Sequence, residues 1–518
     1  MFRILFFVLS LFSGSALATI DLVVTGITYS GGSFSATVQN NGSTSVLSGS
    51  TIIVRYVSDC VHRTWGSVAG PLASGASTTV PMVGGGYSLP TGTTPVLAYV
   101  DYDGMIAETN ELNNTFLTSI TVSSGTGNTI YVATTGNDST GTGLIGAPYA
   151  TIQKAHDVAV AGDTIILRAG TYTPTAQTNL TKSGTTNNLI TLTNFTGETV
   201  TIDGVSSGAG SDILRFNSAS YWYVKGLNFF RASRNAIRLE GASNNNTFER
   251  NVISNSGNNS TVGTGLQIVG TSANNLVLNN DSHHNHDTTV GGGNSDGFSA
   301  QGLGNGNVFR GNRAWKNGDD GFDYFNRDGT ASSGPVLVES NWSFENGFDD
   351  AYVAQGDGNA FKLGGSIDSE TVGKSGGHTV RNNVAWGNKH RGFDQNGASI
   401  PITIYNNTSY NNAVANFNFS SGSHILKNNI NYGTNGAMTG VSDTFNSWNL
   451  SVTVNSADFT ATPGQNDTCA RSARQSDGSL PVCNNFKLVA GSDLIDKGTP
   501  VGISYLGAAP DLGAYELQ

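Results

Sequence analysis

The stretch Asn312-Arg313-Ala314-Trp315-Lys316-Asn317 decides the fold, because its pattern occurs five times in the chain. Each copy reads asparagine, any residue, serine or alanine, an aromatic ring, any residue and asparagine. Successive copies begin 32, 29, 42 and 24 residues apart, at Asn280, Asn312, Asn341, Asn383 and Asn407. Weaker copies begin at Asn251 and Asn429.

Repeats of this length indicate stacked units, and short alternating strands between Asn and Gly turns indicate that each unit is one coil of a parallel β-helix. Strands of neighbouring coils lie about 4.8 Å apart, so equivalent side chains form ladders. In such ladders asparagines satisfy turn amides and rings stack on rings. A β-propeller would show more evenly spaced blades. We therefore interpret the repeat as scaffold that carries no chemistry by itself.

The composition agrees with an all-β fold. The 518 residues include 67 Gly, about twice the usual share of roughly 7%, whereas only 12% are charged, about half the usual share. With only 12 Pro and 9% aromatic residues, the sequence is typical of neither collagen nor a disordered linker. A lone amphipathic segment, Tyr149 to Val158, precedes the repeats, and we expect it to be a short helix that caps the first coil.

The N-terminal segment predicts where the protein is located, and the net charge limits the classes of partner that it can bind. Residues 1–18 combine Arg3, a short apolar run and a small-residue cleavage site, which predicts a signal peptide and a secreted protein, extracellular or periplasmic. No later stretch reaches the roughly 20 apolar residues of a membrane span. A formal net charge of −11 argues against nucleic acid as a partner. We expect a monomer.

Three cysteines follow the predicted signal peptide. Cys469 and Cys483 are close enough in sequence to close a small loop, which leaves Cys60 alone. We predict a disulfide between Cys469 and Cys483, and three free thiols are the alternative.

We expect residues 129–518 to form the β-helix, with residues 124–128 as a linker before it. Residues 19–123 contain short alternating strands at 20–24, 33–38, 51–56 and 96–100, which predict an Ig-like β-sandwich. This region resembles the bacterial adhesion-related domain CARDB in Asp21-Leu22-Val23-Val24, in Val38-Gln39-Asn40-Asn41-Gly42 and in a closing segment that runs from Ile106 to Asn114. The acidic and amide residues of that closing segment either satisfy turn backbone or hold a Ca²⁺ ion.

A carboxylate cluster stands out in the charge-poor array. Asp296 follows the repeat start at Asn280, and Asp319, Asp320 and Asp323 follow the start at Asn312, so neighbouring coils can bring four carboxylates onto one patch. Packed carboxylates repel unless a cation neutralises them, and oxygen ligands without His or Cys suit Ca²⁺. Lys362 lies one coil further on, where a divalent cation would lower its pKa. The alternative for each residue is solvated surface.

These motifs carry a second resemblance. The order of Asp296, Gly318-Asp319-Asp320-Gly321-Phe322-Asp323, Gly358-Asn359-Ala360-Phe361-Lys362-Leu363 and Arg391-Gly392-Phe393-Asp394 resembles polysaccharide lyase family 9 over residues 129–517. The resemblance implies a right-handed parallel β-helix and a pectate lyase. It also implies that Asp296, Asp319, Asp320 and Asp323 bind Ca²⁺ and that Lys362 is the catalytic base. Ala360 departs from the family pattern, in which we expect Gly.

Three residues in the next coil are candidates for substrate binding. Asp394 has the register of Asp323 but lies two coils away, about 10 Å at the ladder spacing, which is too far for the same ion. It either ties down the floor of the site or lines a further subsite. Lys389 and Arg391 are candidates for sugar carboxylates, with solvated surface as the alternative. The cluster of His283, His284 and His286 suggests zinc only weakly, because His283 occupies the aromatic ladder position.

The sequence therefore predicts a Ca²⁺-dependent lyase that cleaves an acidic polysaccharide, pectate or polygalacturonate, by β-elimination. Three alternatives stay open: a lyase for another uronic-acid polymer, a β-helix glycoside hydrolase that uses paired carboxylates, and a non-catalytic carbohydrate-binding adhesin.

Overall fold

The computed structural model describes residues 20–30, 32–58, 61–85, 87, 89, 92–102, 104–122, 127–503 and 505–517. The predicted signal peptide, Cys60 and most of the predicted linker lie outside these residues. The chain divides between Thr121 and Val122 into two compact units, and each is described by itself. Within the described part, no helix has both the length and the apolar character that a bilayer crossing requires.

The first unit consists of two small sheets. One has the order β1 (Leu22–Ser30), β2 (Ser33–Asn40), β5 (Ser77–Pro81), and the other β4 (Val61–Ala69), β3 (Thr51–Ser58), β6 (Gly92–Val100), β7 (Thr115–Val122). The pairings within β1–β2–β5 and within β4–β3–β6 are antiparallel. Alternate residues of β2 and β3 are buried, as in a sandwich with one face toward the core. The sequence predicted β1, β2, β3 and β6; β4, β5 and β7 were not anticipated.

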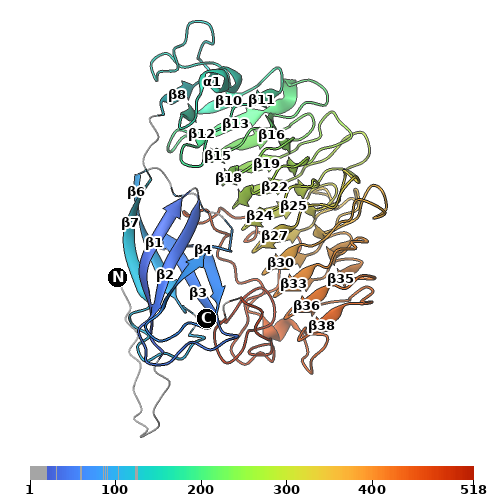
Figure 1. The fold of residues 1–518 in the computed structure, drawn as a ribbon. Helices are drawn as coiled ribbons and strands as arrows, with labels where there is room; N and C mark the ends of the chain where they lie inside the picture. The colour runs from blue at the N-terminus through green and yellow to red at the C-terminus, as the bar shows by residue number, and fades with distance from the viewer. Residues whose placement is uncertain are drawn as a thin grey trace. The chain divides into compact units, whose positions relative to one another are not determined.

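The second unit begins with β8 (Thr129–Val132) and the helix α1 (Ile152–Val158), near the top of Figure 1. Thr151 caps the helix by accepting a hydrogen bond from the Lys154 amide, which supplies a partner for one of the free amides of the first turn. Ile152 and Ala155 are buried and belong to the core of the array. The helix thus covers the apolar end of the first coil, as the sequence predicted.

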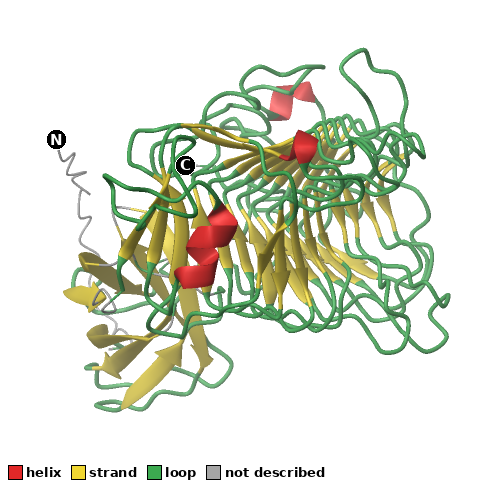
Figure 2. Ribbon diagram, turned by 90° about the horizontal axis from the view of Figure 1, so that it is seen from above, coloured by secondary structure: helices red, strands yellow, loops and turns green. Residues whose placement is uncertain are grey.

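Three long parallel sheets follow; each complete coil contributes one strand to each sheet, and the coils at the two ends lack one or two of these strands. Figures 1 and 2 show these strands stacked in register, with loops between them. Sheet I has 12 strands: β8 (Thr129–Val132), β9 (Thr164–Leu167), β12 (Ile190–Asn194), β15 (Trp222–Lys225), β18 (Thr247–Glu249), β21 (Leu276–Leu278), β24 (Asn307–Arg310), β27 (Val336–Glu339), β30 (Thr379–Arg381), β33 (Thr403–Tyr405), β36 (Ile425–Lys427) and β38 (Ser442–Thr444).

Sheet II has 10 strands: β10 (Gly170–Tyr172), β13 (Val200–Asp203), β16 (Asn228–Phe230), β19 (Val252–Ser254), β22 (Asp281–His283), β25 (Arg313–Trp315), β28 (Trp342–Phe344), β31 (Val384–Trp386), β34 (Thr408–Tyr410) and β37 (Ile430–Tyr432). Sheet III has 9 strands: β11 (Thr178–Leu180), β14 (Leu214–Asn217), β17 (Ile237–Glu240), β20 (Leu266–Ile268), β23 (Phe298–Ala300), β26 (Phe322–Asp323), β29 (Phe361–Lys362), β32 (Arg391–Asp394) and β35 (Ala415–Asn418). Two short 3-10 helices, Gly204–Ser206 and Ser456–Asp458, complete the regular elements of the described residues. The predicted right-handed parallel β-helix and β-sandwich are thereby confirmed.

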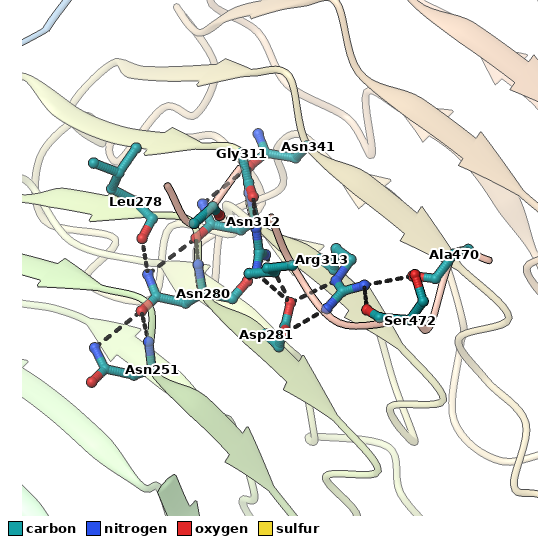
Figure 3. Close-up of polar contacts among 12 residues, drawn as sticks. Asn251, Leu278, Asn280, Asp281, Gly311, Asn312, Arg313, Asn341, Ala470 and Ser472 are labelled. Atoms are coloured by element: carbon teal, nitrogen blue, oxygen red, sulfur yellow. Dashed lines mark hydrogen bonds and ion pairs between the residues drawn. The ribbon is translucent and has the colours of Figure 1, made fainter. Parts of the chain in front are cut away.

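The asparagine ladder lies at the turn between sheets I and II. The side-chain oxygen of Asn312 accepts from both the backbone and the side-chain nitrogen of Asn280, at 2.9 and 3.1 Å, and Asn341 accepts from Asn312 in the same way. Figure 3 shows this part of the ladder, from Asn251 to Asn341. The ladder continues through Asn383, Asn407 and Asn429. Every repeat start that the sequence identified is one rung, so the repeat sets the register.

Two aromatic columns accompany the ladder. In the core, Phe298, Phe322, Phe361, Phe393 and Phe417 of sheet III stack at centroid distances of 4.9–5.1 Å. On the outer face of sheet II, His283, Trp315, Phe344 and Trp386 stack in turn. Residues after 446 pack against this second column, and Arg313 joins Asp281 to the carbonyls of Ala470 and Ser472 (Figure 3). That segment contains the predicted disulfide between Cys469 and Cys483.

Candidate active site

Sheet III places Asp323 and Lys362 side by side. Asp323 of β26 pairs in register with Lys362 of β29, and Phe322 and Phe361 pair at the neighbouring position of the same two strands. Because side chains alternate along a strand, the two phenyl rings enter the core and the two charged groups face outward. Asp394 of β32 is the next residue in the same row, two rungs from Asp323, as the sequence predicted.

Three carboxylates converge beside Lys362. One oxygen atom of each of Asp296, Asp320 and Asp323 lies within 4.8 Å of the corresponding atoms of the other two, and all three residues are buried. Asp296 lies in the loop before β23, and Asp320 lies in the turn before β26. Lys362 Nζ is 3.2 Å from Asp320 Oδ2 and 4.0 Å from Asp323 Oδ2. We name Asp296, Asp320 and Asp323 the carboxylate trio.

Asp319 lies beside the trio and is not one of its members. Its Oδ1 accepts a hydrogen bond of 2.7 Å from the backbone amide of Asp357, and the residue is buried. The charges of Asp320 and Asp296 still act on it. The structure therefore brings three of the four predicted ligands into one group and holds the fourth at its edge.

Neutral donors fix the carboxylates from behind. Gln301 donates its side-chain amide to Asp323 Oδ2 at 2.6 Å, and Thr264 donates its hydroxyl to Asp296 Oδ2 at 3.2 Å. Asn359 donates both its backbone and its side-chain N–H to Asp320 Oδ1, at 2.7 and 2.8 Å. Sequence reasoning missed these roles. Asn359 stands in the motif that contains Lys362, but no sequence signal marks Gln301 or Thr264, because their partners lie 22 and 32 residues away.

The electrostatics of the cluster are unfavourable without a compensating cation. Burial, followed by the charges of Asp323 and Asp320, raises the pKa of Asp296 well above its usual value. Burial and the charge of Asp323 raise the pKa of Asp320 to about 6, against the opposing effect of Lys362. Burial lowers the pKa of Lys362, but the charges of Asp323, Asp320, Asp319 and Asp296 together raise it well above its usual value. These carboxylates alone therefore keep Lys362 protonated.

The trio fits a hard divalent cation. All of its donors are carboxylate oxygens, which is the ligand chemistry of Ca²⁺. The Oδ1 atom of Asp296 is buried and has no hydrogen-bond partner among the described residues, although a buried carboxylate oxygen is normally satisfied. A cation bound there would supply the missing partner and the missing positive charge.

The three candidates for substrate binding have protein partners. Arg391 donates to Asp394 Oδ2 at 2.7 Å, and Asn418 donates to Asp394 Oδ1 at 2.9 Å. Lys389 Nζ donates to the carbonyls of Gln355 and Gly356. These contacts hold Asp394 and the 355–356 turn in place, and Arg391 keeps other N–H donors for a ligand.

The histidine cluster is part of the scaffold. His283 stacks on Trp315 at 4.2 Å, and burial lowers the pKa of His283 to about 3. The Nδ1 atom of His284 lies 2.7 Å from Nδ1 of His283, and its Nε2 atom pairs with Asp350 at 2.8 Å, so both ring nitrogens of His284 have protein partners. In the first unit, Asp101, Glu108 and Glu111 approach one another within 4.8 Å, while Asp101 also accepts from the amides of Met105 and Ile106, as expected for a turn.

Comparisons with known proteins point to one family. A family profile described as "Pel9A-like, right handed beta helix region" matches residues 130–431, and CARDB matches residues 22–118. Pectate lyase L of Dickeya dadantii is 34% identical over 413 residues, which cover 74% of this chain and 90% of that protein. Pectate lyase PEL9 of Emericella nidulans is 34% identical over 340 residues, 61% of this chain and 80% of that protein.

Two solved structures share the fold and part of the sequence. The crystal structure of pectate lyase Pel9A superposes with a TM-score of 0.65 and 33% identity, covering 76% of this chain and 96% of that one. A rhamnogalacturonan lyase superposes with a TM-score of 0.61 and 26% identity, covering 70% of this chain and 97% of that one.

Proposed function

Because this chain belongs to the Pel9A-like β-helix family, polysaccharide lyase family 9, and is a pectate lyase with an N-terminal CARDB domain, we propose a metal-binding role for its clustered carboxylates and a catalytic role for its lysine. The carboxylate trio, with Asp319 at its edge, holds Ca²⁺, and Lys362 is the catalytic base. The observation that carries this proposal is the convergence of three buried carboxylates, two of which, Asp320 and Asp323, lie 3.2 and 4.0 Å from the half-buried amine of Lys362.

The reaction requires removal of a very weakly acidic hydrogen. In a uronate, the C5 hydrogen lies next to the carboxylate, and the glycosidic oxygen on C4 is the leaving group. Bound Ca²⁺ would supply positive charge to the substrate carboxylate and thereby stabilise the negative charge that develops after proton loss. Lys362 Nζ takes the C5 proton, the electron pair forms the C4–C5 double bond, and the C4–O bond breaks to leave an unsaturated uronide.

Lys362 can act as a base only when the charge of the carboxylates is compensated. Burial lowers the pKa of Lys362, while the neighbouring carboxylates raise it further than burial lowers it. Cancelling the carboxylate charge leaves burial as the dominant effect and brings the neutral amine within reach. A base of this kind works best near its own pKa, so we propose an alkaline optimum.

The surrounding residues hold the carboxylate trio and Lys362 in position. Gln301, Asn359 and Thr264 fix the three carboxylates, and the stacked Phe322 and Phe361 fix the strands beneath them. We assign substrate contacts to Lys389 and Arg391, and a supporting role to Asp394, which Arg391 and Asn418 hold. We further propose that the protein is secreted, that residues 1–18 are its signal peptide and that it acts as a monomer.

An eliminase assay tests the proposal. Purified protein is offered polygalacturonate, rhamnogalacturonan and alginate, with Ca²⁺ or with excess chelator, and the ultraviolet absorbance of the unsaturated product is followed. We expect Ca²⁺-dependent absorbance with polygalacturonate. A greater rate with rhamnogalacturonan would favour a second candidate function, cleavage of rhamnogalacturonan, which the structural likeness to a rhamnogalacturonan lyase supports. Full activity in chelator would contradict the role of the trio.

A further inference from the structure

The outward-facing row of sheet III extends well beyond Lys362. Register pairs connect these residues one strand at a time, and we name them the outer row: Asn179, Arg215, Arg238, Gln267, Ser299, Asp323, Lys362, Asp394 and Asn418. Arg238 is four rungs from Lys362, about 19 Å at the strand spacing. An extended polymer lying along the outer row would therefore pass Arg238 at a distance of several sugar units from the reacting bond.

Three arginines lie at this remote end, and the charge of a fourth, Arg327, reaches them from the loop that follows β26. Arg215 and Arg238 belong to the outer row, Arg234 precedes β17, and Arg327 follows β26. Burial lowers the pKa of Arg234, and the charges of Arg238, Arg215 and Arg327 lower it further, against the opposing charge of Asp212. Arg215 and Arg238 are register neighbours that share Glu240, and Arg234 experiences the charges of both and of Arg327.

The ion pairs that these four arginines form do not neutralise their charge. Glu240 pairs with both Arg215 and Arg238, and Asp212 lies 4.0 Å from Arg234. No carboxylate of the described residues pairs with Arg327, whose side chain is exposed. Two carboxylates thus face four guanidinium groups, which is a local surplus of positive charge in a chain whose net charge is −11.

The outer row is polar between the arginines and the trio. Arg238 donates to Gln267, Gln267 donates to Gln301 at 3.0 Å, and Gln301 donates to Asp323. The hydroxyl of Ser299 is buried and has no hydrogen-bond partner among the described residues. On the other side of Lys362, the outer row continues with Asp394 and Asn418, and Arg391 is paired with Asp394. The larger group of cations therefore lies on the N-terminal side of Lys362, whereas on the other side Lys389 bonds backbone carbonyls and Arg391 bonds Asp394.

We propose that Arg215, Arg234, Arg238 and Arg327 form a remote subsite that binds the carboxylates of an acidic polysaccharide several units from the cleaved bond. Guanidinium groups recognise carboxylates through paired hydrogen bonds, and uronate units present such carboxylates along the chain. The inference rests on the proposed function, because Lys362 defines the reacting position. Its consequence is a preference for long substrates, since binding energy from remote units can assist the chemical step.

The test compares substrates of different length. The variants Arg327→Gln, Arg234→Gln and their combination are assayed on trigalacturonate and on polygalacturonate. Arg168→Gln is the matched control, because Arg168 follows β9 of sheet I and is paired with Glu198. We expect each variant at the subsite to lower the ratio of kcat/KM for the polymer to that for the trimer by about fivefold, the upper range for an exposed ion pair. The control leaves the ratio unchanged.

A binding measurement separates this inference from the proposed function. Calorimetry of octagalacturonate with the Lys362→Met chain reports affinity without turnover. Weaker and less salt-dependent binding after Arg327→Gln supports the subsite, even if the wild-type chain proves not to use Lys362. An unchanged polymer-to-trimer ratio in the double variant, or an affinity for octagalacturonate equal to that of the Arg168→Gln control, would overturn the subsite.

Discussion

Replacing Lys362 by Met should change catalysis and Ca²⁺ binding in opposite directions. Met retains an unbranched apolar stem but lacks the amine, whose Nζ lies 3.2 Å from Asp320 and 4.0 Å from Asp323. Loss of a general base costs about 10²–10⁴-fold in rate. The same change removes a positive charge that competes with the metal for the same carboxylates.

The size of the competition follows from the distances. Two unit charges 4 Å apart interact by about 4 kcal/mol at an effective dielectric constant of about 20. Part of this energy is offset, because without the lysine charge the trio binds protons more tightly and must release them to the metal. We therefore expect Ca²⁺ to bind the Lys362→Met chain at least about tenfold more tightly than the wild-type chain, which corresponds to about 1.4 kcal/mol.

Calorimetric titration with Ca²⁺ at mildly alkaline pH measures this affinity, and the eliminase assay measures the loss of rate. The control is Lys427→Met, because Lys427 ends β36 on sheet I, away from the carboxylate trio. Equal or weaker Ca²⁺ binding by Lys362→Met, with the control unchanged, would refute the electrostatic reasoning. Retained eliminase activity would refute the assignment of the base.

Three further predictions concern metal linkage and stability. Saturating Ca²⁺ at 100 times its Kd should stabilise the wild-type chain by about 2.7 kcal/mol, and Asp296→Asn should abolish that shift in a thermal melt; an equal shift in both would contradict the site. Asn341→Ala should lower the free energy of unfolding by about 3 kcal/mol, because its buried amide bonds Asn312 on one side and Asn383 on the other; a loss no larger than that of the exposed Asn305→Ala would contradict the ladder. The pKa of Glu339 is lowered to about 2, because Arg310 and Arg381 outweigh its burial. Its contribution of about 3 kcal/mol is present above the unfolded pKa near 4.3 and is lost as the pH falls toward 2. Denaturant midpoints should therefore show Glu339→Gln less stable than wild type at pH 7, with the difference shrinking toward pH 2; a constant difference would contradict the linkage.

The sequence predicted those parts of the molecule in which one residue type repeats at one structural position. Asn280, Asn312 and Asn341 bond directly to one another, so the spacing of the repeat is also the spacing of the rungs. The carboxylates stood out for a related reason, since an array with few charges contains four of them within 28 positions, from Asp296 to Asp323. Asp323 and Lys362 then met in register one rung apart.

The arginines of the outer row could not be predicted in the same way. Arg238 lies in a coil that precedes the first recognisable copy of the repeat, so no register connects it with Lys362 by sequence alone. Loops of variable length separate the rungs, and only the strand pairing places Arg238 in the row of Asp323. Gln301 was missed because a neutral side chain that fixes a carboxylate has no pattern of its own. The strands β4, β5 and β7 were not predicted because serine, threonine and other polar residues interrupt their apolar residues.

The central claim is that buried carboxylates and Lys362 perform a metal-dependent elimination. The most direct measurement is the initial rate of ultraviolet absorbance from polygalacturonate as Ca²⁺ is titrated into metal-free protein, for the wild-type chain and for Lys362→Met side by side. We predict a rate that rises from zero to saturation with Ca²⁺ in the wild-type chain and stays at least about 100-fold lower in the variant at every Ca²⁺ concentration. Equal rates in the two chains, or a wild-type rate independent of Ca²⁺, would contradict the claim.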